Sequence, residues 1–144
     1  MLGLIQRVSE ARVLVKGNTV AEIGPGLLLL LGIEQSDSET EAVKLVNRVL
    51  NYRVFNDDLG HMNLSLLDVI GELLVVSQFT LAASTNKGLR PSFSSAASPE
   101  DAQALYDFFV RVAAQRVSVQ TGHFGADMQV SLVNDGPATF ILSA

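Results

Sequence analysis

One stretch decides the fold, Leu73-Leu74-Val75-Val76-Ser77-Gln78-Phe79-Thr80-Leu81. Its apolar start, Leu73 to Val76, is typical of a strand buried inside a sheet. The stretch then turns polar although no Gly or Pro ends it, so we expect Ser77 to Thr80 to carry hydroxyl and amide groups inward on rigid strand backbone. Groups held in this way line pockets. The alternative interpretation is that the strand simply reaches solvent here.

Strand geometry sorts these polar residues by face. If residues 73 to 82 form a regular strand, Gln78 and Thr80 share one face while Ser77 and Phe79 point the other way. Gln78 and Thr80 are therefore predicted to meet a substrate together. If the hydrogen-bonded ladder ends near Phe79, the backbone N–H groups there are free to donate to a developing oxyanion.

Other strands are expected on both sides of this stretch. Alternating residues from Leu2 to Val8 and an apolar run from Ala11 to Val15 predict two strands, and Gly17-Asn18 predicts a hairpin turn after them. The run from Leu27 to Ile33 is typical of a strand covered on both faces. Two closing strands are predicted at Met128 to Val133 and Thr139 to Leu142, with a turn at Asn134 to Pro137 between them.

Two amphipathic helices are also predicted. Ser36 to Glu39 offers a capping box for a helix from about residue 38 to 52. Ser98 as N-cap, with Pro99 at the first helical position, begins the second. The positions expected to face the core are Ala42, Leu45, Val46, Val49 and Leu50 in the first helix and Leu105, Phe108, Phe109 and Val112 in the second.

These elements predict one domain spanning residues 1–144, because no repeat or linker interrupts them. We expect the α+β class, with a mainly antiparallel, strongly curved or barrel-like sheet and two principal helices. A chain of 144 residues is long enough to bury one core. Its composition, 48% apolar and 17% charged, excludes disorder and indicates that some surface is covered by a partner subunit.

Several chemistries lack the residues that they need. There is no Cys, hence no thiolate nucleophile, disulfide or zinc knuckle. The acidic pair Asp57-Asp58 lacks the spacing of a calcium loop, so we expect no metal, and no Gly signature indicates a phosphate-bearing cofactor. A hydroxyl nucleophile at Ser77 or Thr80 needs a base. The two histidines, His61 and His123, lie beside Gly residues and are predicted to be loop residues.

Charge and hydropathy limit the partners and the compartment. The start of the chain, Met1 to Arg7, has no basic region followed by an apolar one, and the longest apolar run, Leu27 to Leu31, is too short to span a bilayer. We therefore expect a cytoplasmic protein. A net charge of -5 argues against a broad nucleic-acid footprint and leaves room for contact with the tip of an RNA.

The two motifs Ser77 to Leu81 and Asn134 to Thr139 together resemble those of the D-aminoacyl-tRNA deacylases, also called D-tyrosyl-tRNA deacylases. The resemblance runs along the whole chain, including Ile5 to Val8, Arg90 to Phe93 and Asp127 to Ser131. It implies a homodimer that hydrolyses the ester between a D-amino acid and the terminal adenosine of tRNA, and that also acts on mischarged glycyl-tRNA.

The resemblance also implies roles for Gly136 and Pro137. On frequency alone a cis bond is not expected there, because about 5–6% of X-Pro bonds are cis. In the family this bond is cis, and its carbonyls reach into the partner's pocket. Gly136-Pro137 would hold the substrate's α-amino group so that an L side chain is rejected, with Arg7 supporting the segment. Ala138 departs from the family, which more often has Val, and this puts the rigidity of the segment in doubt.

For catalysis the resemblance implies little side-chain chemistry and assistance from the RNA's own 2'-hydroxyl. Thr80 and Gln78, beside Ser77, would line the site, and amides near Phe79 would polarise the ester carbonyl. Lys87 and Arg90, in the polar segment from Ser84 to Phe93, are either acceptor-stem contacts or solvated charges. Two alternatives remain open: a non-catalytic oligomeric module that binds a small ligand or RNA end, and a general hydrolase of small esters or amides.

Overall fold

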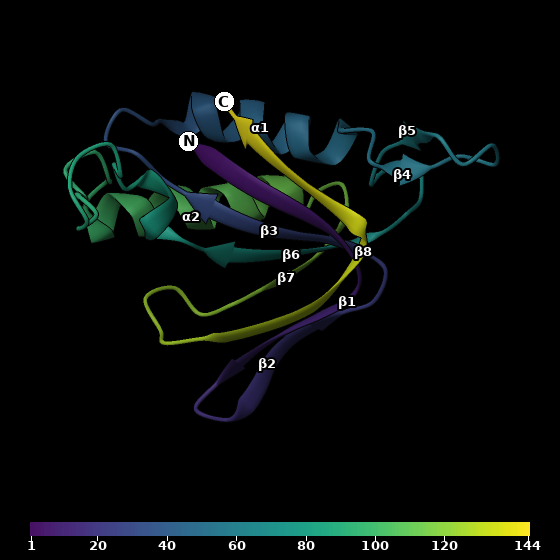
Figure 1. Ribbon diagram of the computed structural model, residues 1–144, viewed down its shortest axis with the longest axis horizontal. Coiled ribbons are helices and arrows are strands. Elements are labelled where there is room, and N and C mark those ends of the chain that lie inside the picture. Colours follow the sequence, from purple (N-terminus) through teal and green to yellow (C-terminus); the bar gives the residue numbers. More distant parts are fainter.

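The computed structural model describes residues 1–144. Two long helices lie on one side of a sheet that curls back on itself below them (Figure 1). The predicted class is confirmed, since the sheet is nearly barrel-shaped and carries two principal helices. None of the helices has the length and the hydropathy that a bilayer-spanning helix requires.

The antiparallel half of the sheet is built around β1 (Leu2–Val15). Along one edge β1 pairs first with β3 (Gly26–Gly32) and then with β2 (Asn18–Ile23). Along its other edge it pairs with β8 (Gln129–Ser143). The sequence predicted two strands between residues 2 and 15, but they form one. The turn falls at Lys16-Gly17, one residue earlier than expected, and both residues have positive φ.

The remaining strands of this sheet, β6 (Glu72–Ser77) and β7 (Ser118–Thr121), run parallel to β3. β6 pairs with β3 on one side and with β7 on the other. Side chains of β3 and β6 alternate between two cores, one under the helices and one inside the curl of the sheet, which explains their unbroken apolar runs. The helix side receives Leu27, Leu29, Leu31, Leu73 and Val75, and the inner side receives Leu28, Leu74 and Val76.

Both helices form as predicted. α1 (Glu39–Asn51) begins at a capping box between Ser38 and Glu41, and its five expected apolar positions are all buried. α2 (Pro99–Ala113) begins at Ser98. Its buried stripe differs from the prediction, because Leu105, Phe108 and Val112 are only partly buried. The fully buried positions on α2 are Ala102, Tyr106, Phe109 and Ala113.

Three short elements complete the chain. β4 (Phe55–Asn56) and β5 (Met62–Leu64) form a small separate hairpin, and η1 (Phe79–Ala82) is a 3-10 helix directly after β6. The acidic pair considered as a calcium loop lies in the turn of this hairpin. There the Asp57 carboxylate accepts hydrogen bonds from the N–H groups of Leu59 and His61, which is a local turn contact.

Candidate functional site

β6 ends at Ser77, so the strand does not continue to Leu81 as predicted. The last bond of the ladder runs from the Gln78 N–H to the Leu31 carbonyl, over 2.8 Å. The chain then turns into η1, which packs over Gly32 of the neighbouring strand. A Cβ at Gly32 would lie 2.8 Å from the Leu81 Cβ, so only glycine allows this approach.

The turn leaves two backbone donors without a partner. The hydrogen bonds of η1 begin with the Leu81 N–H donating to the Gln78 carbonyl, over 3.1 Å, and continue with Ala83 donating to Thr80, over 3.2 Å. The N–H groups of Phe79 and Thr80 donate to no backbone or side-chain acceptor. Unpaired N–H groups at the start of a helix are ready donors to an anion or a polarised carbonyl.

The side chains of Gln78 and Thr80 contact each other, but not because they alternate along one face of a strand. The Gln78 amide Nε2 donates to the Thr80 hydroxyl across the first turn of η1. Gln78 is half-buried, whereas Thr80 is exposed. The two side chains that were expected to share a strand face are therefore joined by the 3-10 turn.

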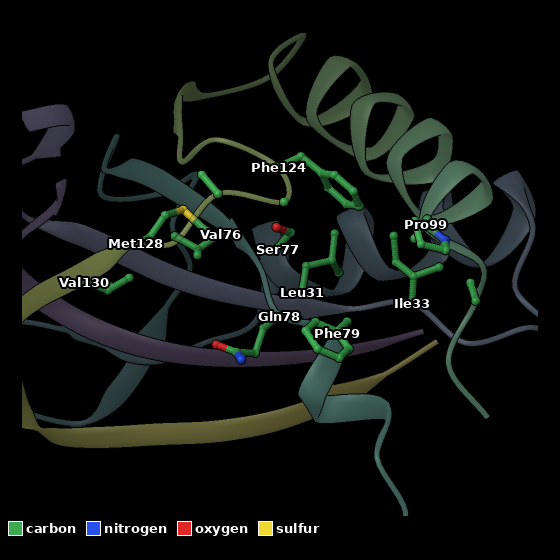
Figure 2. A pocket seen from close by; sticks show the side chains of 14 residues that line it. Leu31, Ile33, Val76, Ser77, Gln78, Phe79, Pro99, Phe124, Met128 and Val130 are labelled. Atoms are coloured by element: carbon green, nitrogen blue, oxygen red, sulfur yellow. The ribbon is translucent and has the colours of Figure 1, made fainter. Parts of the chain in front are cut away.

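An apolar cavity of about 440 Å³ opens beside this turn. Ser77, Gln78 and Phe79 line it, and Thr80 does not. Figure 2 shows Ser77, Phe124 and Leu31 bordering the same space. The rest of the lining comes from the start of α2, the segment after β7 and two strands, and comprises Ile33, Val76, Ala97, Pro99, Ala102, Gly125, Ala126, Met128 and Val130.

Phe124 and Met128 were not predicted as site residues. Phe124 lies in a loop between two glycines, and an aromatic residue in such a loop was the available signal. Its ring packs against Tyr106, with ring centroids 5.7 Å apart. The Tyr106 hydroxyl donates to the Val75 carbonyl over 2.8 Å, and burial, with the nearby Asp107 charge, raises the Tyr106 pKa. The hydroxyl therefore stays protonated and holds this wall of the cavity.

The loop after η1 packs against the ring of Phe79, and this residue stays 61% exposed. The rings of Phe79 and Phe93 lie 5.2 Å apart, and Ser84 and Ser92 exchange backbone hydrogen bonds of 2.8 and 3.0 Å. Lys87 and Arg90 are exposed at the tip of this loop, and neither forms an ion pair.

The histidines lie as loop residues, as predicted. His61 is exposed in the β4–β5 turn, and His123 is exposed in the loop after β7. Neither forms a hydrogen bond with Ser77 or Thr80, so no hydroxyl here is paired with a base in this structure.

Gly136 and Pro137 lie in a wide bulge within β8, not in a turn between two strands as predicted. Gln6 pairs with Thr139 and Val8 pairs with Asn134, so the four residues Asp135 to Ala138 stand opposite Arg7 alone. The Gly136-Pro137 peptide is cis. The Asn134 side chain closes the bulge, because its oxygen accepts from the Ala138 N–H over 2.7 Å.

Arg7 holds the bulge in place by a hydrogen bond to its main chain. It is 8% exposed, and its Nε donates to the Asp135 carbonyl over 2.7 Å while Nη1 donates to the Val54 carbonyl over 2.5 Å. Gly136 has φ of +148°, and a Cβ there would lie 3.0 Å from Arg7 Nη2. The exposed surface at Gly136-Pro137 is therefore main chain and a proline ring, with the exposed Asp135 carboxylate beside it.

Within one chain the two motifs are apart. The strand registers place Arg7, Leu27 and Leu73 in one row, whereas Ser77 lies four residues further along β6, about 13 Å at strand spacing. β8 is also separated from β6 by β1 and β3. Ser77, Gln78, Phe79 and Thr80 thus form one cluster, and Arg7, Gly136 and Pro137 form another.

Comparisons with known proteins agree along the whole chain. Residues 4–143 match the model of the family described as D-Tyr-tRNA(Tyr) deacylase. A D-aminoacyl-tRNA deacylase of Actinobacillus pleuropneumoniae serotype 5b (strain L20) is 62% identical over 142 residues, covering 99% of each chain. Another, from Haemophilus influenzae (strain 86-028NP), is 58% identical over 143 residues, again covering 99% of each chain.

Two solved structures are similar. A c-Myc DNA unwinding element binding protein superposes with a TM-score of 0.96 at 39% identity, covering 100% of this chain and 99% of the other. A probable eukaryotic D-amino acid tRNA deacylase shares the fold, with a TM-score of 0.86 at 17% identity, and the match covers 99% of this chain and 98% of the other. The chain therefore belongs to the D-Tyr-tRNA(Tyr) deacylase family and is an enzyme of that class, a hydrolase of aminoacyl-tRNA.

Proposed function

We propose that the enzyme cleaves the ester of D-aminoacyl-tRNA between Phe79 and the apolar cavity. The observation that carries this proposal is the pair of unpaired N–H groups on Phe79 and Thr80, which lie beside a cavity of about 440 Å³. The ester carbonyl oxygen accepts from these donors, which stabilise the negative charge that develops as water attacks. The terminal adenosine occupies the cavity, where its base packs on Phe124 and Met128.

The chemistry is completed by the substrate itself. No base lies within hydrogen-bond reach of Ser77 or Thr80, so neither hydroxyl is activated as a nucleophile. The 2'-hydroxyl of the terminal ribose assists attack of water on the carbonyl carbon. The C–O bond to the 3' oxygen breaks, and that oxygen takes the proton that water releases. A tRNA ending in 2'-deoxyadenosine tests this, because its D-aminoacyl ester should be hydrolysed much more slowly, whereas an unchanged rate would contradict the RNA's role.

Chiral selection comes from a second copy of the chain. Gly136 and Pro137 are exposed, present the main chain and the proline ring, and lie in another part of their own protomer from Phe79. In a homodimer this bulge enters the partner's site and binds the substrate's α-amino group. An L side chain would then collide with rigid backbone, whereas a D side chain points away.

Mixed dimers test this arrangement. Gly136→Ala disturbs the bulge and Phe79→Pro removes one donor, so each variant alone should be nearly inactive. When the two variants are refolded together, about half of the dimers should be mixed, and each mixed dimer should have one complete site out of two. The activity should therefore recover to about a quarter of that of wild type. No recovery on mixing would mean that the two clusters do not act across a dimer.

Glycyl-tRNA is a second expected substrate. Glycine has no side chain to collide with the Gly136-Pro137 backbone, so a site that selects only by rejecting L side chains admits it. Hydrolysis of mischarged glycyl-tRNA at a rate comparable to that of a D-aminoacyl-tRNA is expected, and resistance of glycyl-tRNA would indicate a site that binds the D side chain instead.

A further inference from the structure

A second depression, of about 420 Å³, lies between α2 and the loop after β7. One face of α2 supplies Gln103, Asp107 and Arg111, which are spaced four residues apart and so lie above one another on the helix. The opposite side supplies Thr121 and His123. We call this depression the polar groove.

Apart from Tyr106, whose hydroxyl donates to the Val75 carbonyl, most polar side chains of the groove have no hydrogen-bond partner within the chain. Those of Gln103, Asp107, Thr121 and His123 form no hydrogen bond or ion pair, so their donors and acceptors face solvent. The Arg111 guanidinium lies 5.3 Å from the centroid of the Phe108 ring and forms no ion pair. Stacking on an aromatic ring holds a guanidinium in place and leaves its N–H groups free.

The groove is a neighbour of the apolar cavity, because Phe124 lines both. Figure 2 shows the Phe124 ring at the border of the cavity nearest to α2. The groove is therefore near enough to the cavity to receive the nucleotide next to a base that is bound there.

We propose that the polar groove binds the nucleotide preceding the terminal adenosine of the tRNA. This inference rests on the proposed placement of that adenosine in the cavity. Arg111 and His123 bind the connecting phosphodiester, as guanidinium and imidazole groups commonly do. Asp107 accepts from the exocyclic amino group of the base, which is the contact that a carboxylate makes with cytosine. The CCA end of tRNA has a cytidine at this position.

The first test compares two substrates. Arg111→Ala should raise the KM for D-tyrosyl-tRNA about tenfold without lowering kcat, since a phosphate contact adds binding affinity. The same variant should hydrolyse 3'-D-tyrosyl-adenosine, which lacks the phosphodiester, as wild type does. Arg111→Lys should restore most of the affinity. Lys44→Ala, which removes an exposed charge on α1, is the control and should change neither substrate.

The second test is direct binding of the dinucleotide CpA and of adenosine. Wild type should bind CpA about tenfold more tightly than adenosine, and Arg111→Ala should lose most of this difference while it binds adenosine as wild type does. Equal affinity in wild type, or an Arg111→Ala effect that is the same on both substrates, would overturn the groove assignment. Failure of wild type to hydrolyse D-tyrosyl-tRNA would overturn the proposed function instead, so the two failures are distinguishable.

Discussion

The guanidinium of Arg7 holds the main chain of Asp135, 128 residues away, by a hydrogen bond of 2.7 Å from Nε to the carbonyl oxygen. A second bond joins Arg7 to the Val54 carbonyl. One buried side chain thus fastens the Gly136-Pro137 bulge to the body of the protein.

Arg7→Ala should therefore loosen the bulge and destabilise the fold. Loss of a buried donor leaves two carbonyl groups without their partner, which should lower the free energy of unfolding by about 2–4 kcal/mol. Urea unfolding followed by circular dichroism measures this. Arg12→Ala, on the exposed side of the same strand, should cost less than about 0.5 kcal/mol. Equal costs for the two variants would contradict the role given to Arg7.

The Phe79 N–H can be removed by Phe79→Pro. Phe79→Leu also loses the ring but keeps the N–H. The difference in rate between the two variants therefore measures the contribution of the N–H donor. Loss of one donor to an oxyanion typically costs about 10²–10³ in kcat, so the proline variant should be slower than the leucine variant by about that factor on D-tyrosyl-tRNA. Similar rates for two folded variants would argue that Phe79 gives no such hydrogen bond.

Thr80→Ala should retain substantial activity. Its hydroxyl accepts from Gln78 and positions that amide, so we expect a loss of less than about a hundredfold in kcat, whereas removal of a true nucleophile costs about 10⁶. Single-turnover kinetics on D-tyrosyl-tRNA distinguish the two. A complete loss with the fold intact would favour a covalent threonine mechanism.

Lys87 and Arg90 should contribute to tRNA affinity through charge alone. We expect the slope of log K for tRNA binding against log salt concentration to be less negative by about one to two when both are replaced with alanine. Each phosphate contact contributes about one to this slope. Filter binding of uncharged tRNA at several salt concentrations measures this slope. If the slope equals that of wild type and of Lys44→Ala, the two residues are solvated loop charges.

Local signals in the sequence were sufficient for the helices. The capping box at Ser38 and the apolar positions of α1 lie within a few residues of one another, so their pattern specifies the helix without knowledge of the rest. In the predicted stripe of α2 only Phe109 is fully buried, because the neighbouring elements decide which side of the helix is covered, and the small residues Ala102 and Ala113 are buried with it.

The errors at the site arise from distant parts of the chain. η1 replaces the end of the predicted strand because Gly32, on a neighbouring strand, lets Leu81 pack closely against it. The residues Ser77 to Leu81 alone contain no signal for this contact. The bulge in β8 likewise depends on Arg7. The cavity joins Ser77 to Phe124 and Met128, which are brought together only by the order of strands in the sheet. Motif residues could be named from the sequence, but their partners could not.

Chiral discrimination is the central claim, and it is tested most directly by measuring hydrolysis of D-tyrosyl-tRNA and L-tyrosyl-tRNA prepared from the same tRNA. If the Gly136-Pro137 backbone rejects L side chains, the D ester should be cleaved at least about a hundredfold faster in kcat/KM. Equal rates on the two esters would contradict the chiral mechanism.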